Sequence, residues 1–96
     1  MKNKLSPQEM ELYQRIDEIL FYKWDPIGLS DSAWVRNEYQ SYLPEVFKLA
    51  MKSESTDMVA AYLTAVATEN MGLKQSPRHD RAIAELIMQI KKGINL

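Results

Sequence analysis

His79 is the residue best suited to acid–base chemistry, because it is the single histidine of the chain and stands between Ser76 and Asp80. Serine, histidine and aspartate can form a nucleophilic triad, but only when the three side chains bond to one another in a fixed order. Ser76 is followed by Pro77, a pair typical of a helix start, so the serine is better explained as a helix cap. We therefore interpret His79 as a solvent-facing residue and expect no enzymatic activity.

The rest of the sequence offers little for metal or cofactor chemistry. The chain has no cysteine, which excludes thiolate ligands, disulfides and a cysteine nucleophile. Asp17 and Glu18 are adjacent, so on a helix with 3.6 residues per turn they point about 100° apart. The segment 25–32 lacks the ligand spacing of a calcium loop, and three glycines leave no phosphate-binding loop. We expect no metal, no cofactor and no small-molecule substrate.

Length and composition are those of one globular domain, so we treat residues 1–96 as a single α-helical domain. The chain has 96 residues, 46% of them hydrophobic and 26% charged, whereas a typical domain has about 100–150 residues. The net charge of −1 is unlike that of most nucleic-acid-binding domains, which are strongly basic. The last predicted helix carries two basic pairs, and they lie at its opposite ends: Arg78 and Arg81 near the start, and Lys91 and Lys92 near the end. We therefore expect no direct contact with nucleic acid.

The chain start does not look like a targeting segment. Residues 1–4 are charged, but Ser6 and Pro7 follow instead of the apolar run that a signal peptide requires. No apolar stretch approaches the roughly 20 residues needed to span a bilayer. We expect a cytoplasmic protein that does not enter a membrane.

Apolar residues recur at three- or four-residue steps in four segments, a pattern typical of α-helices. The predicted helices run from about 7 to 22, from 44 to 52, from a cap at Ser55 or Thr56 to 71, and from 77 to the lysine pair before Gly93. Ser6 and Glu9 have the spacing of a capping box around the first helix start. The recurring apolar positions place Lys23 on the inner face of the first helix and Asn70 on the inner face of the third. Gly72 comes just after the third helix. We predict about 60–70% helix and no strand, well above the helix content of about 30–35% in average globular proteins.

The segment 24–42 is the least periodic part of the chain. We expect a short helix over 33–36 and irregular chain over 37–41. The segment is also rich in aromatic residues, namely Trp24, Trp34, Tyr39 and Tyr42. Aromatic side chains either anchor such a connection to the core or form a contact surface. We favour anchoring and expect Trp24 and Tyr42 to be largely buried. The predicted fold is all-α, a compact bundle of four main helices with a short helical excursion between the first and second.

Charge is distributed unevenly along the chain. Residues 5–69 contain eleven acidic and five basic residues, a net charge of −6, whereas residues 70–96 contain two acidic and five basic residues, a net charge of +3. An acidic surface of this kind could attract a basic partner; an ordinary solvated surface is the alternative. The candidate partner-binding residues lie on or near the excursion and the adjoining helix ends: Asp25, Asp31, Glu38, Glu45, Glu54 and Asp57.

Four sequence segments together resemble a family of small bacterial proteins of unknown function. They are WDPIG at 24–28, EYQSYLP at 38–44, YL at 62–63 and MGL at 71–73. The resemblance covers about residues 12–90, and Asn37 departs from it because the usual residue there is aspartate. Some small acidic proteins of this kind resemble immunity proteins encoded beside secreted toxins, including those of contact-dependent inhibition.

The resemblance implies a helical protein that binds and neutralises a cognate toxin, a nuclease in our interpretation, by covering its active or substrate-binding surface. The alternative is a general bacterial interaction or regulatory module with another partner. The shared motif also has a purely structural interpretation. Asp25, Pro26 and Gly28 suit a turn, while Tyr39 and Tyr42 could anchor the excursion, so specificity could lie on other residues.

Overall fold

The computed structural model describes residues 5–28, 33–52 and 55–96, and within these ranges it contains helices and no strand. The helices are α1 (Pro7–Ile19), α2 (Ala33–Gln40), α3 (Leu43–Lys52), α4 (Thr56–Ala65) and α5 (Pro77–Ile94), with π-helical turns η1 (Leu20–Trp24) continuing α1 and η2 (Val66–Asn70) continuing α4. The all-α prediction, with four main helices and a short helix after the first, is confirmed. Helix makes up 80% of the described chain, more than we expected.

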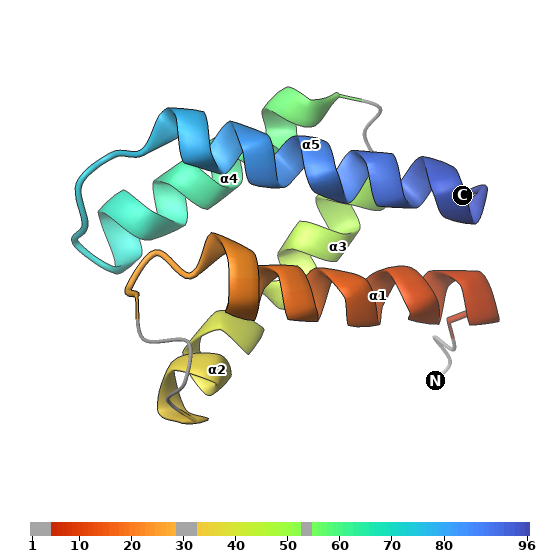
Figure 1. The fold of residues 1–96 in the computed structure, drawn as a ribbon, viewed down its shortest axis with the longest axis horizontal. Coiled ribbons are helices and arrows are strands. Elements are labelled where there is room, and N and C mark those ends of the chain that lie inside the picture. The colour runs from red at the N-terminus through yellow and green to blue at the C-terminus, as the bar shows by residue number, and fades with distance from the viewer. Residues whose placement is uncertain (1–4, 29–32, 53–54) are drawn as a thin grey trace.

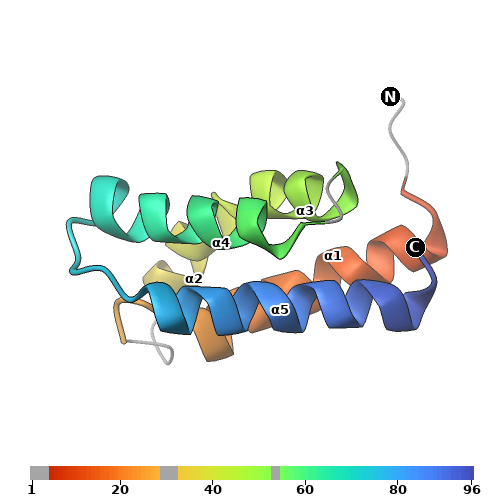
Figure 2. The same ribbon diagram turned by 90° about the horizontal axis from the view of Figure 1, so that it is seen from above.

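The helices form two layers (Figures 1 and 2). In one layer α1 and α5 run side by side in opposite directions, and in the other α3 and α4 lie behind them. The short helix α2 lies near the η1 end of α1 and connects the two layers. In the part of the chain that the structure describes, no helix combines the length and apolar character needed to cross a membrane.

The helix starts follow local sequence signals at two of three predicted caps. The Ser6 hydroxyl accepts a bond from the Glu9 backbone N–H (3.1 Å), and the Glu9 carboxylate accepts one from the Ser6 N–H (2.8 Å), which confirms the capping box. Ser55 caps α4 by accepting from the Asp57 N–H. Ser76 precedes α5 as predicted, but its side chain makes no capping bond, because its backbone angles differ from the extended form seen at Ser6 and Ser55.

Two predicted inner-face residues are instead exposed, and the π-helical turns explain both errors. A π-helical turn bonds residue i to residue i+5 and so holds about one more residue than an α-helical turn. The bonds from the Asp25 N–H to the Leu20 carbonyl and from the Met71 N–H to the Val66 carbonyl have this spacing. The inward position therefore passes from Lys23 to Trp24 and from Asn70 to Met71. Trp24 is buried and Met71 half-buried, whereas Lys23 and Asn70 face solvent.

The predicted irregular chain over 37–41 was wrong, because α2 continues as regular helix to Gln40. Its length places Tyr39 on the inward face, where the ring is 1% exposed and packs 5.6 Å from the Trp24 ring centroid. The prediction for Trp24 is confirmed at 1% exposed, while Tyr42 is half-buried. Trp34, which we expected to anchor the excursion, is 60% exposed.

The helix ends agree with the sequence less closely than the starts. Gly72 follows the cap of η2 with a φ of 69°, the left-handed conformation that the prediction of a terminating glycine requires. At the other end, α5 passes through Gly93 and ends at Ile94. Asn95, another residue that tolerates positive φ, takes the left-handed position there (φ 70°).

The two tryptophans give a matched test of this core. Replacing Trp24 with alanine should lower the free energy of unfolding by about 3–5 kcal/mol, as for other buried aromatic truncations. Replacing Trp34 with alanine removes the same atoms from an exposed site and should change it by less than about 0.5 kcal/mol. Urea unfolding followed by far-UV circular dichroism measures both. Equal losses at the two positions would contradict the arrangement described here.

Candidate functional site

The polar groups best suited to chemistry meet where η1, α4 and α5 converge. The Asp80 side chain, in the first turn of α5, is only 2% exposed. Its Oδ1 accepts a bond from the Trp24 indole N–H (2.9 Å), and its Oδ2 accepts one from the Thr64 hydroxyl (2.8 Å). A buried carboxylate needs such partners, and the positive end of the α5 dipole also favours its negative charge. Asp80 therefore connects three elements from inside the core.

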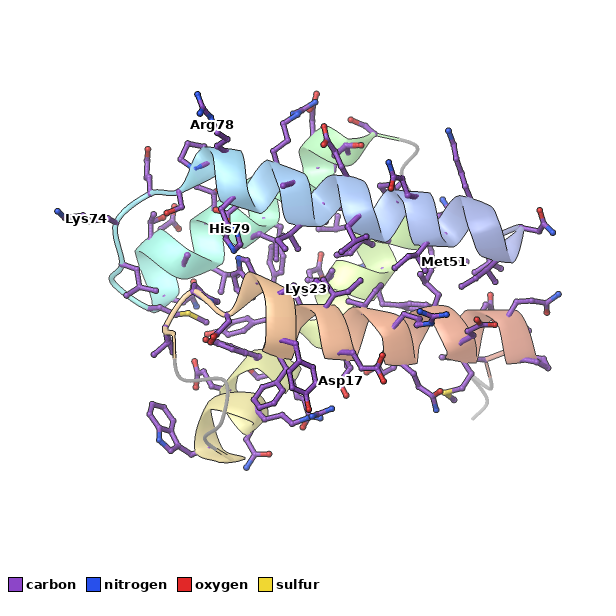
Figure 3. The ribbon with its side chains drawn as sticks, in the orientation of Figure 1. Asp17, Lys23, Met51, Lys74, Arg78 and His79 are labelled. Carbon is purple, nitrogen blue, oxygen red and sulfur yellow. The ribbon has the colours of Figure 1, made fainter. Side chains whose placement is uncertain are left out.

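His79 is mostly exposed, yet its ring also connects α5 to η1. Its Nε2 lies 2.8 Å from the carbonyl oxygen of Trp24, and because a carbonyl only accepts, Nε2 is the donor. Figure 3 shows His79 on the side of α5 that faces the end of η1. Among the described residues no hydrogen bond joins His79 to Ser76 or Asp80. The arrangement is thus not that of a Ser–His–Asp triad.

A small pocket of about 160 Å³ opens beside this cluster, lined in part by Pro26, Lys74, Ser76 and His79. Lys74 points from the η2–α5 connection into solvent, as does Arg78 from α5 (Figure 3). Within the described ranges every buried side-chain nitrogen and oxygen has a hydrogen-bond partner. The same ranges contain no grouping of three His, Asp or Glu residues that could hold a metal ion. No feature of the pocket indicates a particular ligand.

The turn after η1 is built from the residues of the WDPIG segment. Asp25 adopts a left-handed backbone (φ 34°), and Gly28 follows with a φ of 79°. The Asp25 carboxylate accepts bonds from the Gly28 N–H (3.2 Å) and from the Tyr39 hydroxyl (2.8 Å), while that hydroxyl accepts from the Ile27 N–H (3.0 Å). Burial, together with the nearby Asp25 carboxylate, raises the pKa of Tyr39 above its ordinary value. The structural interpretation of this motif is therefore confirmed.

A second cluster, which the sequence did not predict, holds α2 against α1. The Arg36 guanidinium donates to the Asp17 carboxylate (3.1 Å), a bond that raises the pKa of Arg36, and it lies 4.7 Å from the Phe21 ring centroid. The Gln40 amide donates to the same carboxylate (3.3 Å). Figure 3 shows Asp17 on the side of α1 that faces α2. These contacts place one face of α2 firmly against the bundle.

Four of the six predicted partner-binding residues fall in the described ranges, and Asp31 and Glu54 lie outside them. Asp25 and Glu38 are half-buried and accept bonds from the hydroxyls of Tyr39 and Tyr42, respectively. A bond from a neutral hydroxyl leaves the negative charge of each carboxylate in place. Asp57 is exposed, and its charge is offset by an ion pair with the Arg81 guanidinium.

Glu38 and Glu45 each influence a partly buried tyrosine, Tyr42 and Tyr62 respectively. The Tyr42 hydroxyl donates a hydrogen bond to the Glu38 carboxylate (3.0 Å). Burial raises the pKa of both tyrosines, and the carboxylates of Glu38 and Glu45 raise the pKa of Tyr42 and Tyr62, respectively.

The outward side of α2 carries the exposed aromatic Trp34. One and two turns further along this side lie Asn37 and Ser41, both exposed, with the half-buried Glu38 beside them. Residues three, four and seven apart share a face of a helix. We call this set, Trp34, Asn37, Glu38 and Ser41, the outer α2 face. The sequence showed an aromatic-rich segment, but the orientation of Trp34 depends on how α2 docks.

Comparison with known protein families, with curated proteins and with solved structures finds no match.

Replacement of Asp80 tests the buried cluster. Asp80→Ala leaves the Trp24 indole N–H and the Thr64 hydroxyl without an acceptor, and each such loss costs about 1–3 kcal/mol. Asp80→Asn should cost less than half as much, because its amide oxygen can accept from Trp24 and its NH₂ can donate to a rotated Thr64 hydroxyl. Chemical unfolding measures both variants. Equal destabilisation would show that the charge matters rather than the two bonds.

Tyr39, which holds the turn after η1, should make the stability of the protein depend on pH in the alkaline range. Its raised pKa means that the folded protein keeps the hydroxyl proton at a pH where the unfolded chain, with a tyrosine pKa near 10, has released it. Stability is therefore fully present below about pH 10 and falls above it, by up to about 1.4 kcal/mol per pH unit for this group. Tyr39→Phe should be less stable at pH 7 and should lose stability less steeply between pH 10 and 11.5. The measurement is the free energy of unfolding of wild type and Tyr39→Phe as a function of pH. If the two fall equally steeply above pH 10, Tyr39 does not cause the alkaline loss of stability.

Proposed function

We propose that this protein is an immunity-type binding protein that neutralises a cognate secreted toxin, a nuclease, by covering its active or substrate-binding surface. The observation that carries the proposal is Trp34, a tryptophan that is 60% exposed on a helix whose opposite face is firmly attached to the bundle. Tryptophan is strongly enriched among the residues that dominate binding energy at protein interfaces.

Rigidity of α2 is what favours a binding role for this exposed ring. The Arg36–Asp17 ion pair, the Gln40–Asp17 bond and the buried Tyr39 ring all lie on the attached side of the helix. The outer α2 face is thus presented with little freedom left to lose. A contact that orders few additional groups retains more of its interaction free energy as affinity.

Charge supports a nuclease as the class of partner. The segment 5–69 carries a net charge of −6, and Glu38 adds a carboxylate to the face that exposes Trp34. A nuclease attracts phosphate with a basic surface, which an acidic protein can meet by charge complementarity and so bind quickly. A protein with this role acts in the cytoplasm, where it protects the nucleic acid of its own cell.

The second candidate function is an interaction or regulatory module for a partner that is not a toxin. The same exposed tryptophan favours it, since an aromatic anchor does not identify its partner. The two functions differ in one observable. An immunity protein restores growth to cells that express the toxin domain encoded beside its own gene, whereas a regulatory module does not.

The test is co-expression with that neighbouring toxin domain, followed by binding of the two purified proteins. Wild type should restore growth and abolish nuclease activity. Trp34→Ala should raise the dissociation constant at least about 30-fold, in line with a loss of about 2 kcal/mol for an anchor residue. Met58→Ala is the matched control, because Met58 is 52% exposed on α4; it should change affinity less than about threefold.

The double variant Glu38→Gln, Glu45→Gln tests the contribution of the acidic side chains to binding separately from that of Trp34. The amide oxygen at position 38 still accepts from the Tyr42 hydroxyl, so the fold is retained while two charges are removed. Stopped-flow binding across a salt series should show slower association and a weaker salt dependence. Full rescue of growth by Trp34→Ala with unchanged affinity would refute the proposed surface, and no rescue by wild type would refute the toxin partner.

A further inference from the structure

An open groove of about 410 Å³ runs between the α1–η1 helix and α5, away from the outer α2 face. Its walls include the apolar side chains of Ile19, Tyr22, Leu86 and Ile90, and the charged side chains of Glu18 and Lys23. Figure 3 labels Lys23 between the end of η1 and α5, on the layer formed by these two helices. The α3–α4 layer covers only the opposite side of this pair (Figure 2).

Tyr22 is the most exposed apolar residue of the groove, at 63%. Its ring is nevertheless held in place, because it packs edge-on against Phe21 at 4.7 Å between centroids and lies 5.9 Å from the Arg36 guanidinium. A large aromatic ring that is already positioned but uncovered is typical of an interface residue. The groove therefore combines an apolar floor with a projecting anchor.

The charges beside this anchor have no partner within the described chain. Neither Glu18 nor Lys23 makes an ion pair or a side-chain hydrogen bond with another described residue, whereas the neighbouring Arg15 pairs with Glu11 at 3.8 Å. Both are exposed. One free negative and one free positive charge thus stand on either side of Tyr22 along the same helix.

We propose that this groove binds a second copy of the same chain, with the two α1–η1 helices antiparallel about a two-fold axis. In such a pair, residues whose numbers have the same sum face each other across the axis. An axis between positions 20 and 21 brings Glu18 against Lys23 of the other copy. The same axis brings Tyr22 against Ile19 of the other copy, beside its Leu86 and Ile90. One register therefore satisfies both free charges and covers both exposed rings.

This agreement between charge and apolar contact is the argument for a second copy over an unrelated protein. A two-fold axis midway between two opposite charges always pairs them with the charges of the other copy; the added observation is that the same axis also sets the exposed Tyr22 ring against the apolar wall of the groove. The inference is independent of the proposed function, since it uses α1, η1 and α5 rather than the outer α2 face. Its readout is the oligomeric state, which does not require a toxin.

Sedimentation equilibrium of the full chain, from 5 µM to 1 mM at low salt, should show a reversible monomer–dimer equilibrium. Glu18→Lys places two lysines together at each end of the interface, and Lys23→Glu places two glutamates there. Each single change should raise the dimer dissociation constant at least about tenfold, since two symmetry-related pairs are lost and replaced by repulsion. The double variant restores opposite charges and should return to within about threefold of wild type.

The controls carry the same charge changes on exposed residues outside the groove. Glu69→Lys and Lys74→Glu should leave the dissociation constant unchanged, and circular dichroism should show the same helix content in every variant. A monomer at 1 mM would overturn the proposal. So would a dimer that the single reversals do not weaken, or one that the double variant does not restore.

Discussion

The buried carboxylate of Asp80 is the interaction on which the arrangement of the helices depends. This carboxylate accepts one hydrogen bond from the Trp24 indole N–H in η1 and another from the Thr64 hydroxyl in α4. Asp80 itself lies in the first turn of α5. The adjacent His79 adds a bond to the Trp24 carbonyl. Two consecutive residues of α5 therefore hold both the side chain and the backbone of one tryptophan. Helices that otherwise meet through non-directional apolar contacts acquire one defined alignment from this cluster.

The residues of the WDPIG segment and Tyr39 serve the fold, and the exposed aromatic residues suited to binding lie outside the WDPIG and EYQSYLP segments. Trp24 is in the Asp80 cluster, Asp25 and Gly28 shape the turn, and Tyr39 closes it from α2. Trp34, by contrast, belongs to neither the WDPIG nor the EYQSYLP segment, and neither does Tyr22.

Sequence reasoning succeeded where structure is decided locally. The Ser6–Glu9 capping box, the Ser55 cap and the terminating Gly72 involve residues within a few positions of each other, so their spacing was sufficient. It failed where a π-helical turn moved the inward position from Lys23 to Trp24, because a constant period of 3.6 does not anticipate an added residue. The partners of Asp80 were also out of reach, since Trp24 lies 56 positions away. The two tryptophans show the limit most simply: the same residue type, in the same aromatic segment, is buried at 24 and exposed at 34.

The distance between Trp24 and Asp80 along the chain also has a consequence during synthesis. A ribosome makes the WDPIG segment first, and the carboxylate that accepts the indole N–H is added 56 residues later. The nascent protein therefore carries an unburied tryptophan and an incomplete apolar layer until α5 has left the ribosome. Domains generally fold as units, and here the contacts of Trp24 are complete only when α5 is present. Premature termination before residue 80 yields a chain that lacks the acceptor for the Trp24 indole N–H.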